Sequence, residues 1–265
     1  MHNQENCYEN VWILSGTSDG PVLAKKLLAL NYSVFVSVVT YKASQSYCED
    51  SKLHIITGKL NGINQIISFI DKNKIDYVVD ATHPFALVIS ENLQEACKKI
   101  KKHLFVFERK LEIKDNTKFN YISDLKGIKE FDLENKNILL AIGSRALNET
   151  AKYYIRKGAN IFTRVIPTPE SISRTFGSCI EKSNIAILEP SKLGEFILEK
   201  KLCDYWQIDY IICRDSGGYS QINWQQIISE RNIQLFLVSR PVLRYKSPYF
   251  FTEYDNLIYQ ITSKN

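Results

Sequence analysis

The sequence of 265 residues has no apolar run that is long enough to cross a membrane. Its longest nearly apolar run, SVFVSVV at 33–39, is far shorter than the ~20 residues that a membrane-spanning helix needs. The opening residues 1–10 are polar and lack the charged and then apolar layout of a signal peptide. We therefore expect a cytoplasmic protein that does not associate with a membrane.

The six cysteines include no CxxC pair, and the histidines show no paired spacing. A zinc site and a disulfide framework are therefore both poor interpretations. We expect buried, reduced thiols and no bound metal.

The sequence also lacks any run of five or more basic residues. Its formal charge of +5 comes from 34 Lys and Arg against 29 Asp and Glu, and the excess is scattered. A nucleic-acid-binding protein would carry a concentrated basic stripe. This mild excess indicates an anionic small molecule as the partner rather than a nucleic acid.

With 45% hydrophobic and 24% charged residues, the chain can build a full core. Short apolar runs alternate with longer amphipathic runs, which predicts parallel sheets flanked by helices. The expected strands are 11–14, 33–40, 53–57, 75–80, 103–108, 138–142, 160–166, 185–188, 210–213 and 234–239. The expected helices are 21–30, 62–73, 84–100, one from 145, one near 171, one from 193, one over 222–229 and one in the tail after 248.

The alternation weakens into a polar stretch at about 113–136, where we expect a linker with one short helix. The fold class is therefore α/β, with two Rossmann-like domains that have mostly parallel sheets and a cleft between them. We place the domains at 1–125 and 126–265.

The loop SGTSDG at 15–20 joins the first expected strand to the first expected helix. Its Gly16-x-Ser18-x-Gly20 spacing matches the nucleophile elbow of α/β-hydrolases, but the required histidine late in the chain is missing. The dinucleotide fingerprint GxGxxG cannot be placed here either. Backbone N–H groups at a helix N-terminus, beside the hydroxyls of Thr17 and Ser18, favour a phosphate. An ordinary tight turn with a helix cap is the alternative, and Asp19 would repel a phosphate unless it points away.

The stretch DATHPFA at 80–86 follows an expected strand and opens an expected helix. Pro84 suits a first helical turn, and Thr82 or His83 falls where a cap would lie. A cap requires neither Asp80 nor His83, so we interpret these two as candidate catalytic residues. A purely structural histidine remains the alternative.

Several stretches together resemble the precorrin-6A reductase family of cobalamin biosynthesis, which includes cobalt-precorrin-6A reductases. The resemblance runs through nearly the whole chain, and DATHPFA is its most specific part. The other stretches are SGTSD at 15–19, Ser90, Asn92, Ala96-Cys97, Glu108-Arg109, Gly143-Ser144-Arg145, Asp215-Ser216-Gly217-Gly218 and Arg240-Pro241.

The resemblance implies an NADPH-dependent oxidoreductase that reduces one double bond of the precorrin-6A macrocycle. In this function we expect residues 1–125 to bind NADPH and 126–265 to bind the substrate, with His83 and Asp80 as the catalytic residues interpreted above. No acidic residue ends the second strand, so Lys42 can meet a 2′-phosphate there, which favours NADPH over NADH. A solvated lysine without a ligand is the alternative. The expected cofactor-binding residues are Gly16, Thr17, Ser18, Tyr41, Lys42 and Thr82.

A polycarboxylate macrocycle needs cationic hydrogen-bond donors, and arginine meets a carboxylate with two bonds. The arginines that follow expected strands, on the edge where such sheets bind ligands, are Arg109, Arg145, Arg214 and Arg240. The alternative for each is an exposed charge or an ion pair with a neighbouring acid. Ser216 and Gly217 are expected in a turn that contacts the same carboxylates.

Two other functions remain open. A non-catalytic tetrapyrrole binder is favoured by the absence, over 222–225, of a lysine that the family carries. A nucleotide-sugar or phosphate-binding module is opposed by DATHPFA. For the reductase itself we expect a monomer.

Overall fold

The computed structural model describes residues 9–109, 119–128, 131–191, 196–241 and 249–263. The chain forms two compact units, one of Met1–Leu111 with Pro241–Asn265 and one of Glu112–Arg240. This division differs from the expected one at residue 125. The final segment, which we expected in the second domain, belongs to the first unit.

The first unit is built on a six-stranded, all-parallel sheet in the order β12-β5-β4-β1-β2-β3. The strands are β1 (Asn10–Ser15), β2 (Ser33–Val38), β3 (Leu53–Thr57), β4 (Tyr77–Ala81), β5 (Leu104–Phe107) and β12 (Phe250–Phe251). The helices are α1 (Asp19–Ala29), α2 (Tyr41–Ser44), α3 (Ile63–Lys72), α4 (Leu87–Lys99) and α9 (Tyr254–Thr262).

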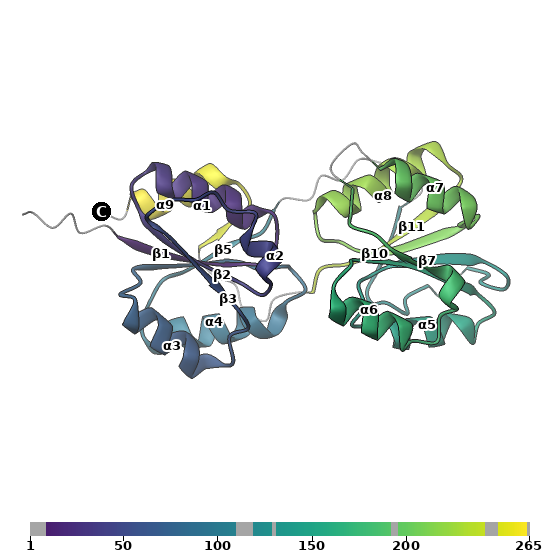
Figure 1. The fold of residues 1–265 in the computed structure, drawn as a ribbon, viewed down its shortest axis with the longest axis horizontal. Helices are drawn as coiled ribbons and strands as arrows, with labels where there is room; N and C mark the ends of the chain where they lie inside the picture. The colour runs from purple at the N-terminus through teal and green to yellow at the C-terminus, as the bar shows by residue number, and fades with distance from the viewer. Residues whose placement is uncertain (1–8, 110–118, 129–130, 192–195, 242–248, 264–265) are drawn as a thin grey trace, which may run out of the picture. The chain divides into compact units, whose positions relative to one another are not determined.

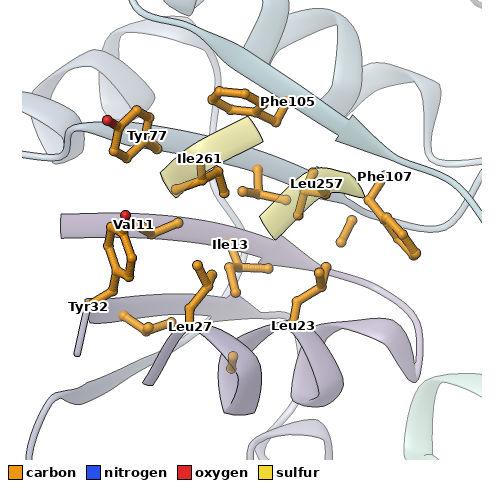
Figure 2. Close-up of a cluster of buried hydrophobic side chains, with 14 of the residues drawn as sticks. Val11, Ile13, Leu23, Leu27, Tyr32, Tyr77, Phe105, Phe107, Leu257 and Ile261 are labelled. Atoms are coloured by element: carbon orange, nitrogen blue, oxygen red, sulfur yellow. The ribbon is translucent and has the colours of Figure 1, made fainter. Parts of the chain in front are cut away.

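Helices cover both faces of this sheet, with α1 and α9 on one face and α3 and α4 on the other (Figure 1). In Figure 2, Leu257 and Ile261 of α9 lie over the same sheet face as Leu23 of α1. Strands that are buried on both faces have continuous apolar runs, which is why the runs in the sequence identified them.

The second unit repeats this plan with a six-stranded parallel sheet in the order β6-β11-β10-β7-β8-β9. The strands are β6 (Phe119–Ile122), β7 (Asn137–Ala141), β8 (Asn160–Val165), β9 (Ile185–Ile187), β10 (Tyr210–Arg214) and β11 (Gln234–Val238). The helices are α5 (Leu147–Ile155), α6 (Pro169–Phe176), a 3₁₀ turn (Lys182–Asn184), α7 (Ile197–Tyr205) and α8 (Tyr219–Glu230). Figure 1 shows α7 and α8 on one face and α5 and α6 on the other.

Both sheets reverse their strand order at one point, between β1 and β4 in the first unit and between β7 and β10 in the second. Ligands of open α/β sheets bind outside the carboxyl ends of the strands at such a reversal. The fold therefore gives each unit one predicted binding edge.

The expected α/β class and the strands and helices named above are confirmed, apart from their exact ends. Four elements were missed, namely α2, the 3₁₀ turn Lys182–Asn184 and the edge strands β6 and β12. The described part of the polar stretch 113–136 carries β6 and contains no helix, so the expected short helix is wrong there.

All cysteines that the structure describes are free thiols. Cys97, Cys203 and Cys213 are buried as expected, but Cys48 and Cys179 are exposed. Cys7 lies outside the described residues. No helix over the described residues is both long enough and apolar enough to span a membrane.

Candidate functional site

A crevice opens at the carboxyl ends of β1 and β2 in the first unit, next to the reversal of strand order. Its volume is about 490 Å³, and it is lined by residues 15–18, by residues 38–40 at the end of β2, and by Ala43, Ser46 and Tyr47. The expected cofactor residues Gly16, Thr17 and Ser18 therefore share one crevice. This is the position where nucleotide cofactors bind in related sheets.

Gly16 brings the loop after β1 against the loop after β4. A Cβ at this position would lie 2.8 Å from the backbone nitrogen of His83. The Gly16 N–H donates to the carbonyl of Ala81 at 3.2 Å, so it is already used. The N–H groups of Thr17 and Ser18, in contrast, have no partner among the described residues. These two amides are the candidate hydrogen-bond donors to a phosphate at this loop.

Asp19 turns into the first unit and makes an ion pair there. Its Oδ1 accepts from Nε and Nη2 of Arg109, at 3.1 and 2.6 Å, and from the hydroxyl of Tyr254. Its Oδ2 accepts from the Thr17 hydroxyl at 2.8 Å. The carboxylate is 5% exposed, and its charge is balanced by Arg109, which removes the expected repulsion of a phosphate.

Arg109 lies beside the loop, since its Nη2 also donates to the Ser18 hydroxyl at 3.0 Å. Burial alone would lower its pKa, but the hydrogen bonds and charge of Asp19 outweigh burial and raise the pKa. Arg109 therefore remains a cation beside residues 15–20, which we call the phosphate loop after their expected ligand. For this arginine the structure shows the alternative that we left open, an ion pair with a neighbouring acid.

At the end of β2, Thr40 begins the short helix α2, and its Oγ1 accepts from the Ala43 N–H at 3.2 Å. Tyr41 and Lys42 lie on α2 and are exposed, so they flank the crevice without lining it. No acidic residue occurs over 38–47, so nothing in this segment repels a 2′-phosphate.

The loop after β4 is organised by Asp80, which is buried at 3% exposure. Its Oδ1 accepts from the backbone N–H of Thr82 at 3.0 Å and from the Thr82 hydroxyl at 2.7 Å. The Thr82 hydroxyl also lies 3.2 Å from Ser90 Oγ.

The start of α4 differs from the expected one. Because these hydrogen bonds occupy the Thr82 side chain, Thr82 does not cap α4. The helix begins at Leu87, its N-cap Ala86 makes no side-chain cap, and Pro84 lies in the loop before it, so the expected cap and first-turn proline are wrong.

His83 is half-buried at this loop, and its Nδ1 accepts from the Phe85 N–H at 3.2 Å. An Nδ1 that accepts carries no proton, so the proton is on Nε2 in this arrangement. Asp80, Thr82 and His83 line one small hollow with Glu108 and Ser90. Its volume of about 10 Å³ is close to the minimum that holds one water molecule. The structure therefore brings the two expected catalytic residues together.

In the second unit, the turn after β10 is held by buried polar contacts. Gln221 donates from Nε2 to Asp215 Oδ1 at 2.8 Å and accepts the Gly217 N–H at 2.7 Å. Gly217 has a φ of +68°, which a side chain would strain. Arg240 donates from Nε to the Asp215 carbonyl at 2.9 Å. Burial raises the pKa of Asp215, while Gln221 and Arg240 oppose that rise.

Arg145 and Arg214 lie at the same edge, after β7 and at the end of β10. Burial lowers the pKa of Arg214, and the charge of Arg145 lowers it further. Two cations at the end of neighbouring strands favour an anion at this edge. Of the four expected arginines, Arg145, Arg214 and Arg240 belong to the second unit, and Arg109 lies at the phosphate loop of the first.

A comparison with known families decides the identity. The model of the family described as "Precorrin-6x reductase CbiJ/CobK" matches residues 10–262. The chain belongs to this family. It is therefore an oxidoreductase of cobalamin biosynthesis, as the resemblance implied.

Similar proteins cover nearly the same length. The cobalt-precorrin-6A reductase of Synechocystis sp. is 28% identical over 235 residues, which are 87% of this chain and 88% of the relative. The cobalt-precorrin-6A reductase of Methanocaldococcus jannaschii is 27% identical over 261 residues, 96% of this chain and 98% of the relative. A solved structure described as CobK precorrin-6A reductase matches with a TM-score of 0.77 at 18% identity, over 96% of both chains. This last likeness supports the two-sheet fold.

The structure places at the two edges several residues of this reductase that the sequence patterns did not identify. Tyr47 lines the crevice, and Tyr254 reaches the phosphate loop from the far end of the chain. Arg164 is buried within β8. A signal for Arg164 was present, because a charged residue interrupts a strand that is expected to be covered on both faces. No such signal marks the two tyrosines.

Over the described residues, no group of three or more His, Cys, Asp or Glu side chains could hold a metal ion.

Proposed function

We propose that the protein reduces one double bond of the precorrin-6A macrocycle, or of its cobalt form, with NADPH as the reductant. The observation that carries this proposal is the family match over residues 10–262, which includes both the crevice of the first unit and the arginines of the second. In the balanced reaction, NADPH transfers a hydride to one carbon of the double bond and leaves as NADP⁺. A proton is added to the neighbouring carbon.

In this proposal the first unit binds the cofactor. The free amides of Thr17 and Ser18 donate to the pyrophosphate, and Arg109 adds a positive charge beside them. Lys42 on α2 meets the 2′-phosphate at the end of β2, where nearby acids are absent. Tyr41, which flanks the same crevice, would contact the ribose, and Thr82, in the loop after β4, would contact the nicotinamide. The amides and cations around the crevice fit a dinucleotide with phosphates. The bound cofactor supplies the hydride.

In this proposal the loop after β4 supplies the proton that is added to the substrate carbon. Nε2 of His83 carries a proton that it can donate or use to position the substrate, while Nδ1 is held by the Phe85 N–H. Asp80 fixes the loop through Thr82 and borders the hollow with His83. A water molecule in that hollow would complete a relay from solvent to the site.

The second unit binds the substrate in this proposal. Arg145, Arg214 and Arg240 donate to the carboxylates of the macrocycle, and the turn at Ser216 and Gly217 borders them. Repulsion between Arg145 and Arg214 is relieved when an anion binds between them. A cytoplasmic location and a monomeric state complete the proposal, and fractionation and size-exclusion chromatography test them.

The test is to incubate the purified protein with precorrin-6A and NADPH and to follow both absorbance spectra. We expect one NADPH to be oxidised for each macrocycle that is reduced. The cobalt form is assayed in parallel, and NADH replaces NADPH in a matched reaction. The proposal fails if the protein leaves both macrocycles unchanged in the presence of NADPH.

A non-catalytic tetrapyrrole binder is the second candidate. The observation that favours it is the absence of the family lysine, where α8 carries the buried residues Asn223 and Trp224 instead. The same assay separates the two functions, because a binder would change the macrocycle spectrum on mixing and leave NADPH unoxidised.

A further inference from the structure

Arg164 is a buried cation inside the sheet of the second unit. It is the residue before the last of β8 and is 7% exposed. Phe162, two residues earlier on the same strand, belongs to the apolar cluster formed with α7 and α8. Side chains alternate between the two faces of a strand, so Arg164 occupies a position on this face where an apolar residue would be expected.

The hydrogen bonds of Arg164 are incomplete. Its Nη2 donates to the Ser220 hydroxyl of α8 at 2.8 Å, and its guanidinium carbon lies 5.7 Å from the centre of the Trp224 ring. Its Nε is buried and has no hydrogen-bond partner among the residues that the structure describes. No described carboxylate lies within ion-pair distance of the guanidinium.

A second unpaired donor lies in the same cluster. The indole Nε1 of Trp224 is buried and likewise has no partner in the described part of the chain. Trp224 is 1% exposed. Leaving a buried donor unpaired costs roughly 1–3 kcal/mol. Because the guanidinium of Arg164 packs over the indole ring of Trp224, the two donors indicate a place for an acceptor that the described residues do not supply.

The nearby acids do not fill this place. Glu199 is buried at 1% exposure, but its oxygens accept from the backbone N–H and the hydroxyl of Ser191, at 2.9 and 2.5 Å. Burial lowers the pKa of Arg164, and Glu199 and Glu189 oppose this through longer-range attraction. The guanidinium thus keeps one donor, its Nε–H, that no described residue accepts.

We propose that Arg164 and the indole N–H of Trp224 form a binding site for one carboxylate of the tetrapyrrole substrate, with Ser220 orienting the guanidinium. This inference rests on the proposed function. The ligand is an acid side chain of the macrocycle, because a planar guanidinium binds a carboxylate with two bonds and because the site lies at the carboxyl edge of β8. Arg164 thereby joins Arg145, Arg214 and Arg240 as a cation that selects a polycarboxylate.

The test measures substrate binding without turnover. Precorrin-6A is titrated into the full chain in the absence of nicotinamide cofactor, and NADPH is titrated separately. The variants are Arg164→Gln, Arg164→Lys, Ser220→Ala and Trp224→Phe, which removes the indole N–H and keeps an aromatic ring. Arg156→Gln is the matched control, since Arg156 is an exposed arginine just after α5 in the same unit.

We expect Arg164→Gln to raise the Kd for precorrin-6A by roughly tenfold or more, the effect of a lost charged hydrogen bond. Arg164→Lys should give a Kd for precorrin-6A between those of the wild type and Arg164→Gln, since lysine keeps the charge and loses the planar guanidinium. Trp224→Phe and Ser220→Ala should each weaken binding by a few-fold. The Kd for NADPH should stay near that of the wild type in all four variants, and Arg156→Gln should change neither value.

Wild-type affinity for precorrin-6A in a folded Arg164→Gln protein overturns the inference, and the two buried donors would then be satisfied by ordered water. If Arg164→Gln does not fold, Trp224→Phe and Ser220→Ala decide, and wild-type binding by both overturns it. A wild-type chain that reduces precorrin-6A while the variants bind it normally defeats this inference alone. A wild-type chain that neither binds nor reduces it defeats the proposed function as well.

Discussion

Asp80 and His83 use their side chains to shape the loop between β4 and α4. Asp80 accepts two hydrogen bonds from Thr82, and His83 accepts one from Phe85. The Asp80 carboxylate is almost fully buried, whereas the imidazole is half-buried beside a hollow. Asp80 is therefore suited to hold the loop in position, and His83 is the group that can reach a substrate or a proton.

Replacing His83 with alanine should reduce turnover by about tenfold or more, which is at the low end of acid–base effects. Only one partly buried hydrogen bond to the Phe85 N–H is lost, so the melting temperature and the Kd for NADPH should stay close to the wild-type values. His54→Ala is the control, because His54 is an exposed histidine on β3. Turnover and stability are measured on the same preparations. Normal turnover, or an unfolded His83→Ala protein, would show that this histidine is structural.

Lys42 should determine the preference for NADPH. Ligands that bind only the folded state raise its stability by mass action, so NADPH should raise the melting temperature more than NADH at equal concentration. Lys42→Ala should weaken NADPH binding by roughly tenfold, the effect of a lost charged hydrogen bond, and leave NADH binding unchanged.

Lys72→Ala provides the control for Lys42, since Lys72 ends α3 and is also an exposed lysine. Thermal shifts with both cofactors give the comparison. Equal shifts for NADPH and NADH in the wild type would contradict this prediction.

At the scale of elements, the last helix, α9, holds the loop after β1 in place through a hydrogen bond. Tyr254 begins α9, stacks on Phe107 of β5 with ring centres 4.7 Å apart, and donates its hydroxyl to Asp19. Burial and the hydrogen bond to Asp19 raise the pKa of Tyr254 to about 12, so the hydroxyl stays protonated at neutral pH. The helix therefore holds the phosphate loop through a donor that does not ionise.

Tyr254→Phe should lower the free energy of unfolding by about 1 kcal/mol and weaken NADPH binding a few-fold. Phenylalanine keeps the ring stacking and removes only the hydroxyl that holds Asp19. Tyr259→Phe on the same helix is the control, because Tyr259 is 71% exposed. Denaturant unfolding and NADPH titration provide the two measurements. If both variants behave alike, the contact between Tyr254 and Asp19 does not matter for the loop.

At the scale of the whole molecule, one edge strand of each sheet lies outside the stretch of alternating strands and helices that forms the rest of that sheet. The order of the first sheet ends in β12, which comes after the whole second unit in the sequence. The order of the second sheet ends in β6, which precedes its other strands. The first unit is therefore complete only when both ends of the chain are present.

A chain that ends at residue 247 should lose the stability of the first unit and keep that of the second. The truncation removes β12 and α9 and exposes the partners of Leu257 and Ile261, which are fully buried. Each such side chain contributes roughly 1.5–3 kcal/mol by burial. Hydrogen exchange read by mass spectrometry should show lost protection over β1, β4 and β5 and retained protection over β7, β10 and β11.

The control for this truncation is a chain shortened by residues 264–265 alone. NADPH binding should disappear only in the longer truncation. Equal protection of the first unit in both shortened chains would mean that α9 is dispensable.

The sequence by itself determined the class of the fold and the residues at the edges of the sheets. The inner residues 11–14 of β1 and 138–141 of β7 are all apolar, as strands covered on both faces require. Their alternation with amphipathic helices then implies parallel sheets, and parallel sheets bring every loop that follows a strand to one edge. For this reason residues as far apart as Gly16 and His83 could be assigned to one site before their contact was seen.

Only the tertiary structure decided which chain segments complete each sheet and which charges meet. The short edge strands β6 and β12 carry little periodicity, because a strand of two to four residues is defined by its partner. The hydrogen bond between Asp19 and Tyr254 joins residues 235 positions apart. Arg164 belongs to the same class, since its contacts with Ser220 and Trp224 and the burial of its unpaired Nε arise only when α8 packs against β8. Local patterns record the burial of a segment, but the partner of a buried polar group depends on contacts that form between distant parts of the chain.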